Sequence, residues 1–200
     1  MAKMIPEANI QLVVGLGNPG AEYVNTRHNA GAILVEGLAR KFGSTLHPEK
    51  KFHGEVAQVK IKGRTLHLLI PTTYMNLSGK AVQAYANFYK IPPEAILVAH
   101  DELDLAPGIA RLKQGGGHGG HNGLRDIINK LGNCKDFFRL RIGIGHPGIK
   151  EQVVGFVLSR APRQEQDLID AVSHEAIHLL PEAITGSWQL AVQQLHRFKG

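Results

Sequence analysis

The stretch from Gln11 to Gly31, QLVVGLGNPGAEYVNTRHNAG, constrains the fold of this 200-residue chain more than any other part of it. The apolar, β-branched run from Ile10 to Val14 predicts a buried strand. Glycines and the turn signal Asn18-Pro19-Gly20 end that strand, and a helix begins near Asn29. A long polar loop therefore leaves the carboxyl end of a strand, which is where open α/β sheets bind their ligands.

Strand patterns and helix patterns alternate along the rest of the chain. This alternation predicts the α/β class, as a single-domain three-layer α/β/α sandwich with a central mixed, mostly parallel, twisted sheet. The domain covers residues 1–200, and residues 1–9 are expected to be a flexible tail. Further strands are predicted at 52–61 and 64–70 (a hairpin through Lys62-Gly63), 96–99, 107–114 and 137–145, and the last two helices at 164–180 and 182–198.

Two helices carry more specific predictions. In the first, Ile33, Leu34, Gly37, Leu38 and Lys41 share one face that should lie on the core. In the second, Ser78 is placed to cap the N-terminus, the core face is Val82, Tyr85, Ala86 and Tyr89, and Pro92-Pro93 ends the helix.

Composition excludes several classes of protein. No apolar run approaches the roughly 20 residues of a membrane span, and the N-terminus lacks the apolar core of a signal peptide, so a cytoplasmic location is the default. The single cysteine, Cys134, excludes an internal disulfide and a cysteine-based metal cluster. The formal net charge of +6 favours a polyanionic partner.

Two short motifs match known binding patterns and are incomplete. Gly15, Gly17 and Gly20 fit the dinucleotide pattern G-x-G-x-x-G, but the helix starts late and Glu36 falls inside it. His174 and His178 belong to an H-E-x-x-H segment that could hold zinc on a helix, although a third ligand is missing. We interpret that segment as a solvated helix face and keep a zinc peptidase as an alternative function.

The polar residues at the predicted sheet edge suggest hydrolytic chemistry. His28 and Asp101 each follow a different strand, and a carboxylate beside a histidine fixes its tautomer and raises its basicity. Asn18, Asn76 and Asn122 also lie at strand–loop–helix junctions. Together they would make a neutral pocket that suits a peptide backbone or a developing oxyanion.

Four basic residues flank the glycine-rich segment GGGHGGHNG at 115–123. Arg111 and Lys113 share one face of a predicted edge strand, and Arg139 and Arg141 share a face of the next strand. If these side chains converge, they form a phosphate clamp, which is typical of nucleic-acid binding by shape and backbone.

Taken together, VVGLGNPGAEYVNTRHNAG, PTTYMNLSGKAV, ILVAHDELDL, GGGHGGHNGLRDII and RLRIGIGHPG resemble the bacterial peptidyl-tRNA hydrolases. The resemblance runs in order from about residue 10 to 160. It implies a cytoplasmic, monomeric, cofactor-free and metal-free esterase. Such an enzyme cleaves the ester between a peptide, or an N-blocked amino acid, and the 3′-terminal ribose of tRNA, and so recycles tRNA from stalled translation.

The resemblance also implies roles for individual residues. His28 would be the general base, Asp101 its orienting partner, and Asn18 would discriminate blocked from free aminoacyl groups. The remaining expected contacts are to the tRNA 3′ end and peptide (Tyr23, Tyr74, Met75, Asn76, Asn122) and to tRNA phosphates (Arg111, Lys113, Arg141). A tRNA-binding module without catalysis is the other alternative. Glycines around VVGFVL would permit the segment 146–160 to cover the peptide groove.

Overall fold

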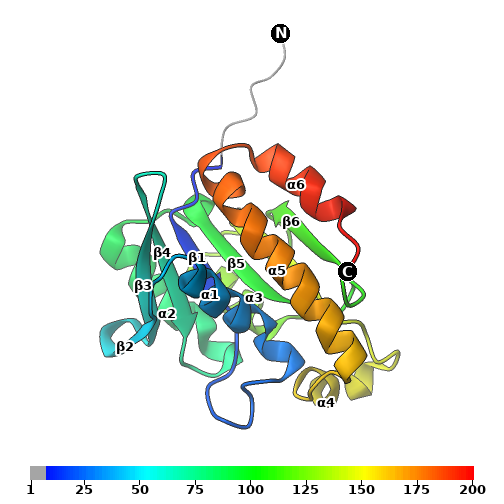
Figure 1. Ribbon diagram of the computed structural model, residues 1–200. Coiled ribbons are helices and arrows are strands. Elements are labelled where there is room, and N and C mark those ends of the chain that lie inside the picture. Colours follow the sequence, from blue (N-terminus) through cyan, green and yellow to red (C-terminus); the bar gives the residue numbers. More distant parts are fainter. Residues whose placement is uncertain (1–7) are drawn as a thin grey trace.

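The computed structural model describes residues 8–200 and consists of one mixed seven-stranded sheet between helices (Figure 1). The strands are β1 (Leu12–Gly15), β2 (His47–Glu49), β3 (Gly54–Ile61), β4 (Arg64–Pro71), β5 (Ile96–Glu102), β6 (Ala110–Gln114) and β7 (Phe138–Gly143), in the order β2-β3-β4-β1-β5-β7-β6. The helices are α1 (Ala30–Lys41), α2 (Ser78–Tyr89), α3 (Asn122–Lys130), α4 (Val153–Val157), α5 (Arg163–Thr185) and α6 (Trp188–Arg197).

The sheet has the predicted mixed character. The four central strands, β4, β1, β5 and β7, run parallel, and antiparallel pairs complete both edges. The hairpin predicted through Lys62-Gly63 joins β3 to β4. Because the central strands are parallel, their carboxyl ends meet at one edge of the sheet, where the loops after β1 and β5 lie together.

Helices cover both faces of the sheet and bury two apolar clusters, which makes the predicted three-layer sandwich. One cluster lies between the sheet and α1, α5 and α6, the helices in front in Figure 1, and includes Val35, Leu97 and Leu140. The other lies beneath α2 and α3 and includes Val14, Tyr85 and Ile127. None of the helices within residues 8–200 is long and apolar enough to span a membrane.

The helical boundary predicted near residue 181 is wrong. Helix α5 continues through Pro181 to Thr185, and α6 begins only at Trp188, after Ser187 accepts a hydrogen bond from the Leu190 N–H. A proline removes one helical donor, but the residues around it, Leu180, Ala183 and Ile184, are buried and hold the helix together.

Two predictions about helix faces and caps also need correction. Leu34 and Leu38 of the predicted face are buried, but Ile33 is exposed and Val35 faces the core in its place, because Gly31 sets the rotation of α1 against the sheet. Ser78 does not cap α2: it is fully buried, and its hydroxyl donates to the Met75 carbonyl. Tyr89, expected on the core face of α2, is 37% exposed.

The predicted tail of residues 1–9 lies mostly outside the described part of the chain, which starts at residue 8. Ala8 is buried, and the Asn9 side chain accepts a hydrogen bond from the Arg64 guanidinium at 2.5 Å. The packed structure therefore includes residues 8 and 9.

Candidate active site

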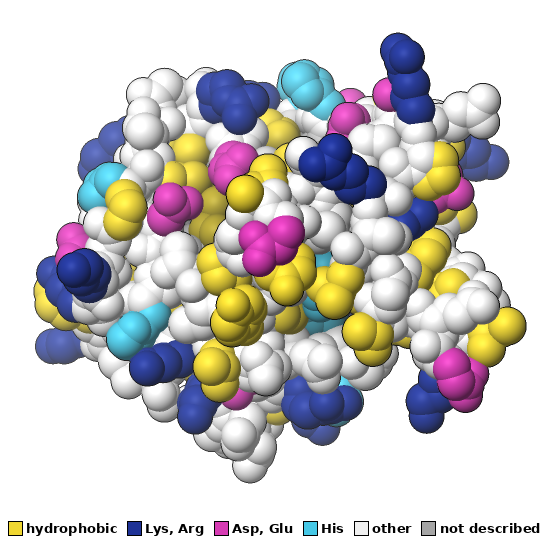
Figure 2. All heavy atoms as spheres, turned by 90° about the horizontal axis from the view of Figure 1, so that it is seen from below, with side chains coloured by type: hydrophobic (Ala, Val, Ile, Leu, Met, Phe, Trp, Pro, Cys, Tyr) yellow, Lys and Arg dark blue, Asp and Glu magenta, His cyan; other side chains and the backbone are white. Residues whose placement is uncertain are grey.

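A cleft of about 550 Å³ opens at the carboxyl ends of the central strands. Its lining divides into two parts. One part is polar and comes from the loops after β1 and β4, from the start of α3, and from Asp101 and Glu102, which are the last residues of β5 and do not follow the strand as predicted. The other is an apolar wall formed by Leu103 and by Val153, Val154, Val157 and Leu158 from the segment around α4. In Figure 2, hydrophobic side chains surround a hollow with histidine at its base, and basic side chains lie around its rim.

Close packing of α1 on β5 brings His28 to Asp101. Leu16 follows β1, and its N–H donates to the Ala99 carbonyl of β5. A side-chain carbon at Gly31 would lie 2.1 Å from the same carbonyl oxygen, so only glycine allows this approach. The one-turn helix Arg27–Asn29, immediately before α1, then places His28 beside the end of β5.

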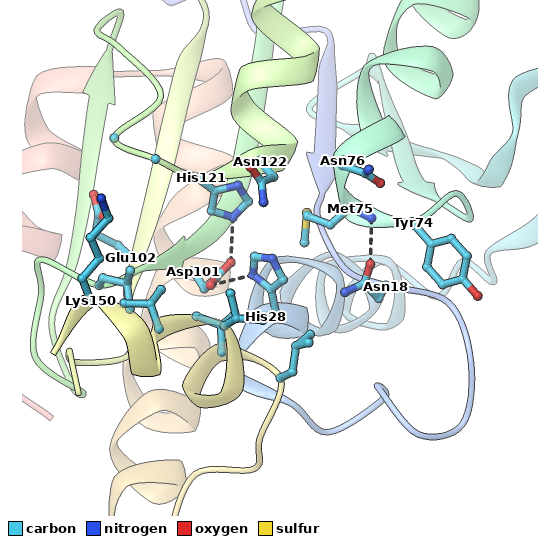
Figure 3. Close-up of a pocket in the computed structure, with 17 residues that line it drawn as sticks. Asn18, His28, Tyr74, Met75, Asn76, Asp101, Glu102, His121, Asn122 and Lys150 are labelled. Carbon is cyan, nitrogen blue, oxygen red and sulfur yellow. Dashed lines mark hydrogen bonds and ion pairs between the residues drawn. The ribbon is translucent and has the colours of Figure 1, made fainter. Parts of the chain in front are cut away.

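The Asp101 carboxylate binds two histidines. It is 3% exposed, its Oδ2 lies 2.8 Å from His28 Nδ1, and its Oδ1 lies 2.8 Å from His121 Nε2 (Figure 3). Burial by itself raises the pKa of the Asp101 carboxyl, but the fields and N–H groups of His28 and His121 outweigh burial and hold that pKa well below its usual range. Asp101 is therefore an ionised acceptor for both rings.

His121 was not predicted, and its surroundings fix its tautomer. Its Nδ1 caps helix α3 by accepting from the N–H groups of Gly123 and Leu124, so Nε2 carries the proton that is donated to Asp101. The sequence contained a feature that could have indicated His121: it directly precedes a predicted helix, after a glycine-rich loop at the same sheet edge. With one Asp101 oxygen held by His121, the other receives the Nδ1–H of His28, which leaves His28 Nε2 with a free lone pair.

A third histidine, His100, lies under this pair and stays neutral. Its Nδ1–H donates to the Asp101 carbonyl, and complete burial, helped by His121, lowers the pKa of His100 to about 3. Neutral His100 adds no positive charge that would compete for the Asp101 carboxylate.

The Asn18 side chain is held in one orientation. Its Oδ1 accepts from the Met75 N–H at 2.7 Å, and the Asn29 side chain bridges the Asn18 backbone N–H and carbonyl. Because the oxygen is occupied by Met75, the amide NH₂ is the group of Asn18 that is left to donate in the cleft.

The other predicted binding residues reach the cleft with one exception. Tyr74, Met75, Asn76 and Asn122 line it, and the Asn122 oxygen accepts from Arg125, which leaves its amide as a donor. Met75 is buried, whereas Tyr74 is 60% exposed. Tyr23 does not line the cleft: it belongs to a turn in the loop after β1, where its N–H donates to the Gly20 carbonyl.

The four basic residues form two directly opposed pairs across β6 and β7, and none of the four lines the cleft. Arg111 is directly opposite Arg141, and Lys113 is opposite Arg139. Arg141 Nε and Nη2 both lie 2.7 Å from a Glu102 carboxylate oxygen. Arg139 is different, since it is 3% exposed and its guanidinium donates to the carbonyls of Gly116 and Gly117. Arg139 therefore fixes the glycine-rich loop and does not offer its charge to a ligand.

Two groups of side chains within residues 8–200 have donors close enough to share a metal ion: His28, Asp101 and His121, and the surface group Glu94, Cys134 and Asp136. In the first, His28 Nδ1–H and His121 Nε2–H already donate hydrogen bonds to the carboxylate. Neither group contains His174 or His178, which are exposed on α5, in agreement with our interpretation of a solvated helix face.

The cleft is equipped to activate water. It combines a histidine lone pair, an ionised orienting carboxylate and several amide donors, and none of the residues between 8 and 200 that line it is a serine, threonine or cysteine. Such an arrangement suits direct attack of water on an ester or another acyl bond, with amide donors at the developing oxyanion.

Comparison with known proteins identifies the relatives of this chain. The family model described as peptidyl-tRNA hydrolase matches residues 12–200. Two curated relatives with the name peptidyl-tRNA hydrolase, from Tolumonas auensis and Azotobacter vinelandii, are each 60% identical over 190 residues, which is 95% of this chain and 96% and 98% of theirs. The crystal structure of peptidyl-tRNA hydrolase from Acinetobacter baumannii has a TM-score of 0.93 and 52% identity, and covers 98% of both chains.

Proposed function

This chain belongs to the peptidyl-tRNA hydrolase family, and we propose that His28, oriented by Asp101, is its catalytic base. The enzyme hydrolyses the ester bond that joins a peptide to tRNA. We place this bond at the 3′-terminal ribose, with an N-blocked amino acid as the smallest acyl group. Hydrolysis releases free tRNA and peptide from stalled or abandoned translation products.

In the proposed mechanism, His28 Nε2 takes a proton from water as that water attacks the ester carbonyl. Asp101 holds the ring through Nδ1–H and stabilises the imidazolium that forms, while His121 holds the other carboxylate oxygen. The proton then passes to the ribose oxygen that leaves. General-base action of this kind contributes about 10²–10⁴-fold to the rate.

Amide donors would stabilise the oxyanion that develops in the transition state and would also set the preference for blocked substrates. The NH₂ groups of Asn18 and Asn122, with Asn76 beside them, are placed to donate to the carbonyl oxygens of a peptide or to the oxyanion. A free aminoacyl group carries an ammonium at the position of the peptide nitrogen. An amide NH₂ cannot accept a hydrogen bond from that ammonium, so the pocket disfavours unblocked aminoacyl-tRNA.

The peptide and the tRNA would extend from the ester bond toward different parts of the site. The apolar wall of the cleft suits the peptide, whose side chains it can remove from water. The tRNA would contact Tyr74, Asn76 and Asn122, with Met75 packed behind them, and its phosphates would lie on Arg111, Lys113 and Arg141. The structure leaves Tyr23 outside the cleft lining, so a contact of this residue with tRNA would be made in the loop after β1.

The Asp101–His28 contact at 2.8 Å in a cleft lined with amides carries this proposal. Its test is hydrolysis of N-acetyl-aminoacyl-tRNA beside unblocked aminoacyl-tRNA, both with excess EDTA. We expect turnover of the blocked substrate only. Binding without turnover would favour a tRNA-binding module, and activity lost to EDTA and restored by zinc would favour a zinc peptidase on His174 and His178.

A second prediction concerns the proposed phosphate clamp. We expect Lys113→Ala and Arg141→Ala each to raise KM, because each removes a cation that would replace a counterion on tRNA. Each should also flatten the slope of log KM against log salt by about one. Lys60→Ala, on the exposed face of β3 near the opposite edge of the sheet, is the matched control and should leave both unchanged. Unaltered KM and slope in the first two variants would rule the clamp out.

We also propose a cytoplasmic location and a monomeric state. The substrate is a product of translation, and one copy of the chain supplies both the His28–Asp101 pair and the cleft around it.

A further inference from the structure

Arg27, the residue directly before His28, is a buried cation whose partners come from a distant part of the chain. It is 7% exposed, although an arginine is seldom buried without strong partners. Its Nη1 lies 2.7 Å from Ser159 Oγ and 3.1 and 3.2 Å from the carbonyl oxygens of Phe156 and Arg160. The guanidinium also lies 3.9 Å above the centre of the Phe156 ring.

A backbone hydrogen bond strengthens the attachment of Arg27 to residues 156–160, whereas an exposed ion pair contributes little. The Arg27 N–H donates to the Ser159 carbonyl at 3.0 Å. Arg27 Nη2 lies 3.4 Å from the carboxylate of Glu165, but the Glu165 side chain is 43% exposed, and ion pairs in water contribute little. The main attachment therefore joins Arg27 to residues 156–160.

Residues 156–160 include part of the apolar wall of the cleft. Val153, Val154, Val157 and Leu158 supply that wall, and they lie in and just after α4, a helix of five residues. Figure 3 shows this segment on the His28 side of the cleft, across from Asn122 and His121. A helix so short has little stability of its own, and Val154 in it is 69% exposed, so its position depends on what fastens it.

We infer that Arg27 is a positioning residue: its guanidinium fixes the apolar wall of the cleft relative to the neighbouring catalytic His28 and thereby sets preference for the acyl side chain next to the ester. This inference rests on the proposed function, because it assumes that His28 is the base and that the wall holds the peptide. A substrate with a large apolar residue beside the ester uses the wall, whereas a glycine in the same place does not.

The test compares two substrates built on the same tRNA, one carrying N-acetylphenylalanine and the other N-acetylglycine. For Arg27→Met, which keeps an unbranched apolar stem and removes the charge and all donors, we expect kcat/KM to fall at least about tenfold more for the phenylalanine substrate than for the glycine substrate. An equal loss with both substrates would mean a merely structural role and would overturn the inference, as would unchanged kinetics.

Two further variants keep the test decisive if Arg27→Met does not fold. Ser159→Ala removes the shortest Arg27 contact from an exposed position and should shift the substrate preference in the same direction by about threefold. Arg160→Ala is the matched control, since only the backbone carbonyl of Arg160 binds Arg27. The Arg160→Ala enzyme should keep the wild-type preference between the two substrates. A preference that is the same in Ser159→Ala as in Arg160→Ala would contradict the inference.

The proposed function is tested separately with His28→Ala on the same two substrates. If that variant keeps near-normal kcat, the base assignment fails whatever Arg27 does. If it is inactive and the Arg27 and Ser159 variants keep the wild-type preference, only the inference about Arg27 fails.

Discussion

Replacement of His28 by alanine is expected to lower kcat by at least about 10²-fold, with little change in KM. The imidazole supplies the lone pair that accepts a proton from water, and its side chain is only 12% exposed, held by Asp101. Because the base acts in the transition state and contributes little to binding of tRNA, the loss should appear in kcat. Steady-state kinetics with N-acetyl-aminoacyl-tRNA measures both quantities.

A histidine elsewhere on the surface controls for the loss of an imidazole. His174→Ala removes an exposed side chain on α5 and should keep wild-type kcat and KM. Near-normal kcat in His28→Ala would withdraw the role of His28. Loss of activity in His174→Ala would reopen the zinc peptidase alternative.

Replacement of Asp101 by asparagine is expected to lower kcat by about 10²–10⁴-fold although the side chain keeps its size. The carboxylate accepts a hydrogen bond from each of two rings, whereas an asparagine has a single acceptor oxygen and would turn its NH₂ toward the other ring. His121 cannot adapt, since its Nδ1 lone pair caps α3. His28 would therefore have to change tautomer and would lose the free Nε2 lone pair.

The matched control is Asp104→Asn, which removes an exposed carboxylate from the loop that follows the same strand, outside the cleft lining. It should leave kcat unchanged. A kcat loss of less than about threefold in Asp101→Asn would show that the carboxylate does not set the tautomer of His28. An equal loss in the two variants would point to the stability of the loop as the cause.

Local patterns were sufficient to predict most of the elements of this fold. Apolar β-branched runs predicted β1, β5 and the β3–β4 hairpin, because burial and backbone preference act within a few residues of each position. Where a prediction from local patterns failed, packing between elements set the helix boundary or the buried face of the helix. Pro181 stays inside α5 because its neighbours are buried, and Ile33 faces outward because Gly31 fixes how α1 lies on β5.

The sequence by itself determined the α/β class and the edge of the sheet that carries the site, and it predicted that His28 and Asp101 both lie at that edge. Parallel strands deliver their following loops to one edge, so two polar loops could be placed together without knowledge of the tertiary structure. The motifs also indicated the family that the comparisons then showed.

Only the tertiary structure decided which polar side chains share a hydrogen bond and which charges are already used. His121 bonds to Asp101, Arg139 fixes a loop, and Arg27 binds residues almost 130 positions away. A hydrogen bond requires atoms to meet within about 3 Å, and local sequence spacing does not fix the distance between side chains on different elements. That distance depends on how helices and loops pack on the sheet.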